Sequence, residues 1–163
     1  MARQFIGART VSGNVPRVTS RPYANGQTFI GGAILIFDGS KNVIEASAAP
    51  VTIVGIAAEP AGSRPGFQAA NNPTIVTGRK QEVIVYDAND DTEFSCRGVN
   101  GGTDPVTPTQ ANVGVSYGAV KDANGIWALN IADVTNTLFT VVDIDIDNKI
   151  FFVKPIGTKL LLP

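Results

Sequence analysis

The sequence predicts an all-β fold of the barrel or sandwich type, and three observations lead to this expectation. Ile, Val and Thr recur in almost every apolar run, and such β-branched residues favour strands. The 17 glycines and 10 prolines interrupt these runs at short intervals, as turns between strands require. Long stretches of Glu, Lys, Gln and Leu are absent, and no alternation of strand and helix patterns is visible. A doubly wound parallel sheet is therefore not expected.

The first 27 residues predict an extended N-terminal arm. They mix Arg, Gly, Ser, Asn and Pro with isolated apolar residues and show no sustained period. Residues 17–23 are expected to be extended, because a residue before proline is pushed out of the helical region. We expect residues 1–24 to lie outside the β core and to be ordered mainly by other chains.

Residues 28–163 are expected to form the β domain, which divides within 59–80 or 98–109 if it consists of two modules. The loop at 59–80 is rich in Pro, Gly and Asn, and loops of this length are often functional. Residues 109–114 could form one helical turn with Thr109 as its N-cap. The expected strands are 28–37, 43–46, 51–58, 74–77, 82–86, 93–96, 115–120, 126–131, 138–146 and 149–153.

The charge is unevenly distributed along the chain. The net charge of −1 gives no general attraction to nucleic acid or to an anionic membrane. Residues 1–37 carry +4 from Arg3, Arg9, Arg17 and Arg21 with no acid, whereas residues 82–147 carry −9 from eleven acids and two bases. Either both regions are solvated, or the basic arm reaches an acidic surface on a partner or a neighbouring copy.

Catalytic chemistry has few candidates in this sequence. There is no histidine, which removes the commonest general base and the commonest zinc ligand. The single cysteine, Cys96, is expected to be a buried thiol, and with no second cysteine no internal disulfide can form. No apolar stretch approaches the roughly 20 residues that cross a bilayer. We therefore expect no enzyme activity, no cofactor, no metal, no small-molecule substrate and no membrane contact.

Two alternating acidic patterns are candidate cation sites. The first resembles the start of a calcium loop: Asp87, Asn89, Asp91 and Glu93. Thr92 then stands where glycine is needed, and Gly98 stands where a bidentate glutamate is needed, so a solvated hairpin turn is favoured. The second is Asp143, Asp145 and Asp147, which a period of two places on one face of a strand. A solvent face is favoured there, with a contact face for arginines or a cation as the alternative.

Several segments resemble a known family of structural proteins. Residues 107–118 and 124–130, followed by an aliphatic and acidic strand, resemble the C-terminal half of tailed-bacteriophage head decoration (capsid cement) proteins. Residues 32–37 through 54–61 have the apolar strand pair and Gly-Ile-Ala strand of the same family. The resemblance implies a β-barrel or β-tulip-like protein, usually a homotrimer, bound where capsid subunits meet, with no cofactor and no catalysis.

The expected function is therefore that of a decoration protein on the outer capsid surface of the virion, synthesised in the host cytoplasm. Its partners would be the major capsid protein and further copies of itself. Contact residues are expected in the basic arm and in the apolar tail: Arg3, Arg9, Arg17, Arg21, Leu160, Leu161 and Leu162. The alternative is a carbohydrate- or receptor-binding β module of a tail fibre or spike. A small glycan-cleaving enzyme, with a carboxylate pair among the fourteen acids, is the third possibility.

Overall fold

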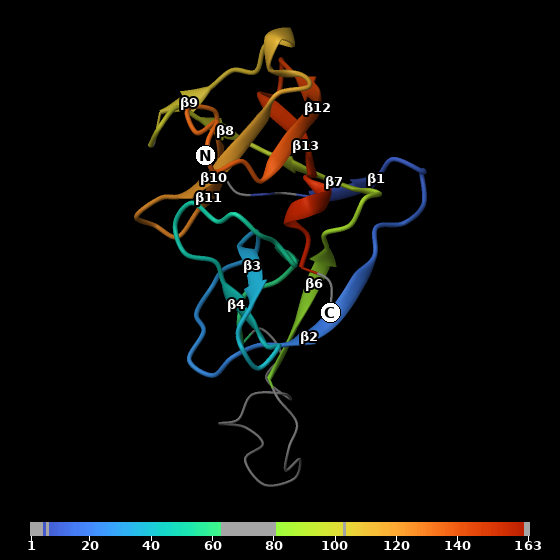
Figure 1. Ribbon diagram of the computed structural model, residues 1–163, viewed down its shortest axis with the longest axis vertical. Helices are drawn as coiled ribbons and strands as arrows, with labels where there is room; N and C mark the ends of the chain where they lie inside the picture. The colour runs from blue at the N-terminus through green and yellow to red at the C-terminus, as the bar shows by residue number, and fades with distance from the viewer. Residues whose placement is uncertain (1–4, 6, 63–80, 103, 162–163) are drawn as a thin grey trace, which may run out of the picture.

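The computed structural model describes residue 5 and residues 7–62, 81–102 and 104–161. Within them the chain forms thirteen strands in two sheets and no α-helix, so the all-β class is confirmed. Two short 3-10 turns, η2 (Gln110–Asn112) and η3 (Gly157–Lys159), are the helical elements of this part of the chain. Figure 1 shows the two sheets at opposite ends of the long axis.

The five-stranded sheet has the order β2-β6-β5-β3-β4, and all its neighbours are antiparallel. The β3–β4 hairpin turns at Asp38, whose carboxylate accepts the backbone N–H groups of Ser40 and Asn42, each at 2.8 Å. One parallel bridge, from Tyr23 to Val43, joins the two edges of the sheet. Its strands are β2 (Val18–Pro22), β3 (Ile34–Phe37), β4 (Val43–Glu45), β5 (Gly55–Ala57) and β6 (Glu82–Asp87).

The eight-stranded sheet has the order β1-β7-β13-β12-β10-β11-β8-β9. Only Arg97 separates β7 from β8, yet these strands hold the second and the seventh places, so the sheet must curl strongly. The two sheets nevertheless do not close into a barrel, so the expected barrel or tulip form is not confirmed. The strands are β1 (Gly7–Thr10), β7 (Thr92–Cys96), β8 (Gly98–Val99), β9 (Pro105–Val106), β10 (Ser116–Lys121), β11 (Trp127–Asn130), β12 (Phe139–Asp145) and β13 (Ile150–Pro155).

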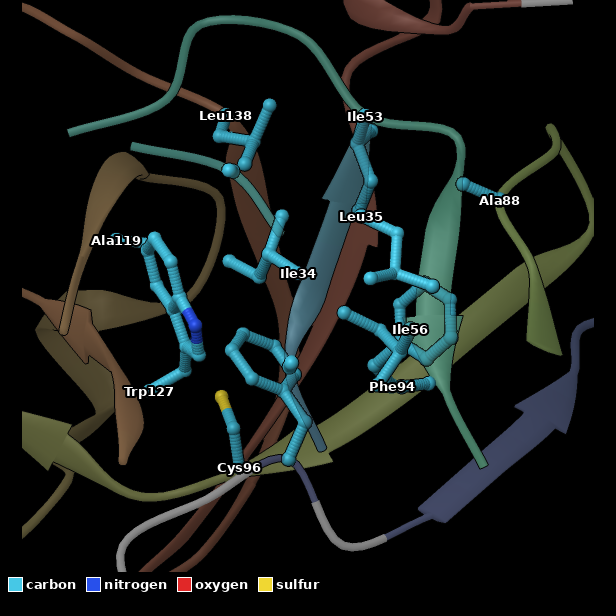
Figure 2. Packing of buried hydrophobic residues seen from close by; sticks show 14 of the residues in the cluster. Ile34, Leu35, Ile53, Ile56, Ala88, Phe94, Cys96, Ala119, Trp127 and Leu138 are labelled. Atoms are coloured by element: carbon cyan, nitrogen blue, oxygen red, sulfur yellow. The ribbon is translucent and has the colours of Figure 1, made fainter. Parts of the chain in front are cut away.

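Both sheets contribute to one hydrophobic cluster. Figure 2 shows Ile34 and Ile56 of the five-stranded sheet packed in the same core as Phe94 and Trp127 of the eight-stranded sheet. The C-terminal half contributes large side chains to this core, and Ile126 beside them is half-buried. They include Tyr117, Trp127, Phe139, Val141, Phe151 and Val153. The chain changes sheets between β1 and β2 and again between β6 and β7. A division into two modules within 59–80 or 98–109 stays a prediction.

The expected N-terminal arm is not confirmed, and much of residues 5–23 is paired or buried within the chain. Strand β1 pairs with β7 at the edge of the eight-stranded sheet, and β2 pairs with β6 at the edge of the five-stranded sheet. Phe5 and Tyr23 are buried in the shared core. Because an edge strand needs a partner on one side only, it tolerates the Arg, Gly and Pro content that suggested an arm.

Most of the other expected elements are present with shifted ends. The strand expected at 28–37 begins only at Ile34, because Ala33 donates its N–H to the Ile30 carbonyl and closes a turn before it. The helical turn at 109–114 is η2, and the N–H of its N-cap residue Thr109 donates to Asn112 Oδ1 at 2.8 Å. The strand expected at 74–77 lies outside the described residues.

Candidate interaction site

The N-terminal segment (residues 7–22) faces a row of acids at the passage between the sheets. This acidic row consists of Asp87 at the end of β6, Asp91 in the following turn and Glu93 in β7. The N-terminal segment runs antiparallel beside this stretch, because β1 pairs with β7 and β2 pairs with β6. Each of the three carboxylates accepts hydrogen bonds from that segment.

Arg9 of β1 binds Glu93, the last acid of the acidic row. Its Nε donates to Glu93 Oε2 at 2.6 Å, and its Nη2 lies 3.3 Å from Asp143 Oδ2 of β12. The guanidinium also stacks over the Phe152 ring, 3.9 Å from its centroid. A planar guanidinium can make these ionic and stacking contacts together, whereas a lysine ammonium cannot. Arg9 therefore fastens β1 to three strands of the eight-stranded sheet.

Asp87 occupies the other end of the row and is almost completely buried. Arg21 donates from Nε and Nη2 to Asp87 Oδ1 at 3.0 and 2.8 Å, and Thr19 Oγ1 donates to the same oxygen at 2.7 Å. Arg17 Nε lies 3.1 Å from Oδ2, close enough for an ion pair but without hydrogen-bond geometry. A buried carboxylate is tolerated only when it is paired, so these three contacts make the burial of Asp87 possible.

The connector between β1 and β2 (residues 11–17) is held to the middle of the row. Ser12 donates from its N–H and its hydroxyl to the Asp91 carboxylate at 2.9 and 2.6 Å, and the Val11 N–H donates to the Asp91 carbonyl at 3.0 Å. The Ser12 hydrogen bonds lower the pKa of Asp91. Figure 1 shows the connector projecting at the side of the molecule between β1 and β2.

The connector and the first residue of β2 carry several of the exposed large hydrophobic residues. Seven large hydrophobic residues are exposed in the described part of the chain, and three of them fall within residues 11–18. They are Val11 at 62%, Val15 at 88% and Val18 at 46% exposure. Single exposed apolar residues are ordinary, whereas contiguous apolar patches mark contact surfaces. We call Val11, Val15 and Val18 the valine group.

The acidic patterns behave differently from the expectation. Asp87 and Glu93 are buried among arginines, so the solvated hairpin expected for that pattern is wrong at these two positions. Asp143 is exposed as expected, but it also pairs with Arg9, which was the alternative for that strand. Among the residues that the structure places, no group of three or more acids or cysteines could hold a metal ion.

The structure places most of the expected contact residues against their own chain. Arg9, Arg17 and Arg21 pair with the acidic row, and Arg3 lies outside the described residues. Leu160 and Leu161 pack against the core, where Leu161 donates its N–H to the Ile53 carbonyl at 2.8 Å. Leu162 lies outside the described residues. Binding of a partner by these seven residues stays a prediction.

The valine group and the pairing of the acidic row with the N-terminal segment were not among the sequence-based predictions. A usable signal was present, because an alternating acidic stretch and an acid-free basic stretch complement each other in charge. The valine group had no such signal, since exposure of single valines depends on where the connector runs.

Comparison of the chain with protein-family models, with curated proteins and with solved structures finds no match. Among the helices that the structure describes, none is both long and apolar enough to span a membrane.

Proposed function

We propose that this chain is a capsid decoration protein that binds the outer surface of a phage head and stabilises the shell. The single observation that supports this best is the valine group on its fastened connector. Each valine left in water costs apolar hydration free energy, which contact with a partner would recover at about 25 cal/mol per Å². A protein whose task is to hold other subunits together needs a surface of this kind.

The mechanism is binding to the assembled state alone. A ligand that binds the closed shell, and not its separated subunits, stabilises the shell by mass action. Many copies on one shell add their effects, so each copy needs only a modest affinity. The arginines at 9, 17 and 21 already have carboxylate partners within the chain, so apolar contact is expected to dominate and ionic contact to add to it.

The alternative of a carbohydrate-binding module has less support. Sugar sites usually present exposed aromatic rings, whereas the exposed large hydrophobic residues of the described chain are all valine or isoleucine. The only tryptophan, Trp127, is completely buried and cannot act as a stacking platform. The described surface therefore favours contact with protein over contact with a sugar.

The experiment is to strip the protein from particles and measure its rebinding across a salt series. A Val11→Ser/Val15→Ser variant is compared with Val134→Ser, a matched control whose valine is 64% exposed on a different loop. We expect the double variant to rebind about tenfold more weakly at every salt concentration, since about 1.4 kcal/mol corresponds to a factor of ten. An Arg9→Ala/Arg17→Ala/Arg21→Ala variant measures the ionic share.

Equal rebinding by wild type and the double valine variant would overturn the role of the valine group. Absence of any rebinding by the wild-type protein, with normal folding by circular dichroism, would overturn the decoration function itself. A solution screen with glycans of the host surface tests the alternative directly.

A further inference from the structure

Strand β1 is an addition to a sheet that the rest of the chain builds separately. Of the described strands, β2 to β6 all belong to the five-stranded sheet, and every later strand belongs to the eight-stranded sheet. Only β1 breaks this order, because it precedes the first group in sequence and joins the second group in space. Strands β2–β6 therefore make up one sheet and β7–β13 the other, and β1 adds one further edge strand to the second sheet.

The side-chain contacts that hold β1 to this sheet are complementary in charge and local to β1. Arg9 binds Glu93 and Asp143, and Ser12 just after the strand binds Asp91. Residues 1–37 contain no acid, so N-terminal segments repel one another and are attracted to an acidic row. None of these contacts requires that Arg9 and Glu93 belong to the same copy of the chain.

A short hinge joins β1, together with Ser12, to β2. On the β1 side of the hinge, the Ser12 hydroxyl donates to the Asp91 carboxylate. On the β2 side, the Arg17 carbonyl accepts the Asp87 N–H. The hinge is residues 13–16, in which Gly13 has a φ of +76°. Pro16 favours an extended backbone, and four straightened residues would span about 14 Å. Short hinges of this kind favour exchange of the element that they carry.

We propose that β1 is exchanged between copies when the protein assembles, so that Gly7–Thr10 of one copy pairs with β7 of a second copy. Arg9 then binds Glu93 of the partner subunit, and Ser12 binds Asp91 of the partner subunit. The contacts of β1 with β7 and of Ser12 with Asp91 are remade between two chains, and only the local hydrogen bonds of the turn at residues 10–14 are lost when the hinge straightens. This inference rests on the proposed function, which brings copies close together on a shell, and it explains how those copies are linked.

A disulfide across the β1–β7 pair tests the exchange. Gly7 lies opposite Ser95, and a Cβ placed on Gly7 would be 3.2 Å from Ser95 Oγ. One full-length chain carries Gly7→Cys and another carries Ser95→Cys, and the two are mixed, refolded together and oxidised. The native Cys96 is completely buried, and burial raises the pKa of its thiol, so it does not compete in the folded state.

Free thiols are alkylated while the samples are denatured, and the products are separated on a non-reducing gel. We expect the Gly7→Cys and Ser95→Cys mixture to give a disulfide-linked dimer of the two variants. Its yield should be several times that of a control mixture of Val134→Cys and Ser95→Cys. A chain with both Gly7→Cys and Ser95→Cys should then form linked oligomers. If the double variant closes only within one chain, and the mixture yields no more covalent pair than the control, the exchange is overturned.

The hinge offers a second measurement that needs no cysteine. Deleting Gly13 and Asn14 shortens the hinge and keeps the valine group, so light scattering should show a larger share of oligomer. Inserting four glycines should show a larger share of monomer. An oligomeric state that does not change with hinge length also overturns the exchange. Rebinding to particles is measured on the same samples. Rebinding without exchange refutes only the strand exchange, whereas exchange without rebinding refutes only the decoration function.

Discussion

Trp127 donates its indole N–H to Glu45 Oε1 at 2.9 Å, and this bond joins the two sheets. Trp127 begins β11 and is completely buried, whereas Glu45 ends β4, 82 residues away in the chain. The second Glu45 oxygen lies 3.1 Å from Lys121 Nζ. A buried indole N–H needs an acceptor. Glu45 of the five-stranded sheet supplies it for Trp127 of the eight-stranded sheet, so the two sheets are connected at this point.

The first prediction concerns this bond. Glu45→Ala leaves the Trp127 N–H without a partner, and we expect the free energy of unfolding to fall by about 1–3 kcal/mol. Glu45→Gln keeps an acceptor for the indole and should lose less. Urea unfolding followed by the fluorescence of the lone tryptophan measures both variants. Equal losses for the two would show that the Lys121 ion pair, and not the indole bond, is what matters at this position.

The burial of Trp127 could be predicted from sequence, but its partner could not. An apolar run after an Asn-Gly turn predicts a buried strand, and β11 is that strand. Glu45 lies in a different hairpin of a different sheet, and no local period connects the two positions. The same limit applies to Asp87, whose arginine partners are 66 and 70 residues earlier, in the segment whose composition predicts an arm.

The second prediction concerns the buried end of the acidic row. Asp87→Asn removes the charge that compensates Arg21, which is only 14% exposed, and we expect a loss of about 3–5 kcal/mol in unfolding free energy. Asp90→Asn, at an exposed position three residues later, should change stability by no more than about 0.5 kcal/mol. Thermal unfolding at neutral pH measures both. A loss as small as that of Asp90→Asn would show that the Asp87 cluster is not needed to hold β2.

The third prediction concerns the close approach of β5 to β6. A Cβ on Gly55 would lie 2.6 Å from Val85 Cγ1 and would overlap the Tyr86 carbonyl oxygen. The backbone cannot retreat without breaking the β5–β6 pairing, so Gly55→Ala should cost about 1–3 kcal/mol.

Gly39→Ala is the matched control for this change. A Cβ there would meet nothing within 4 Å. Alanine also lowers the conformational entropy of the unfolded chain, so we expect a gain of about 0.4–1 kcal/mol in the free energy of unfolding. Chemical denaturation of the two variants compares them. If Gly55→Ala were as stable as Gly39→Ala, β5 and β6 would be further apart than the structure places them.

The edge strands illustrate why residues 1–27 were the hardest part to predict. A central strand can be predicted from its own sequence, because its buried positions are apolar. Strands β12 and β13 are examples, with buried residues at alternating positions. Strands β1 and β2 are short and have half-buried and exposed side chains, and their partners are supplied by β7 and β6. Their order depends on acids far along the chain, so a local reading sees only an aperiodic basic segment.

The last prediction concerns acid and the connector. Ser12 donates two hydrogen bonds to the Asp91 carboxylate, and these hold the pKa of Asp91 below its ordinary value of 3.8. A carboxylate whose pKa is lowered by folding stabilises the folded state at pH values above its unfolded pKa. That stabilisation is lost as the pH falls through the folded pKa. Acid should therefore loosen the connector and β1 below about pH 4, the unfolded range for aspartate.

Ser12→Ala should raise the pKa of Asp91 toward 3.8 and make the fall of stability below pH 4 shallower. Carboxyl-carbon NMR titration measures the pKa, and urea unfolding at pH 2–5 measures the stability. Asn148→Ala is the control, because Asn148 lowers the pKa of Asp145 in the β12–β13 turn and does not touch Asp91. It should raise the pKa of Asp145 alone. An Asp91 pKa that is the same in Ser12→Ala and in wild type would mean that the connector is not bonded to the acidic row in solution. The hinge of the proposed strand exchange would then begin at Val11, directly after β1, and not at Gly13.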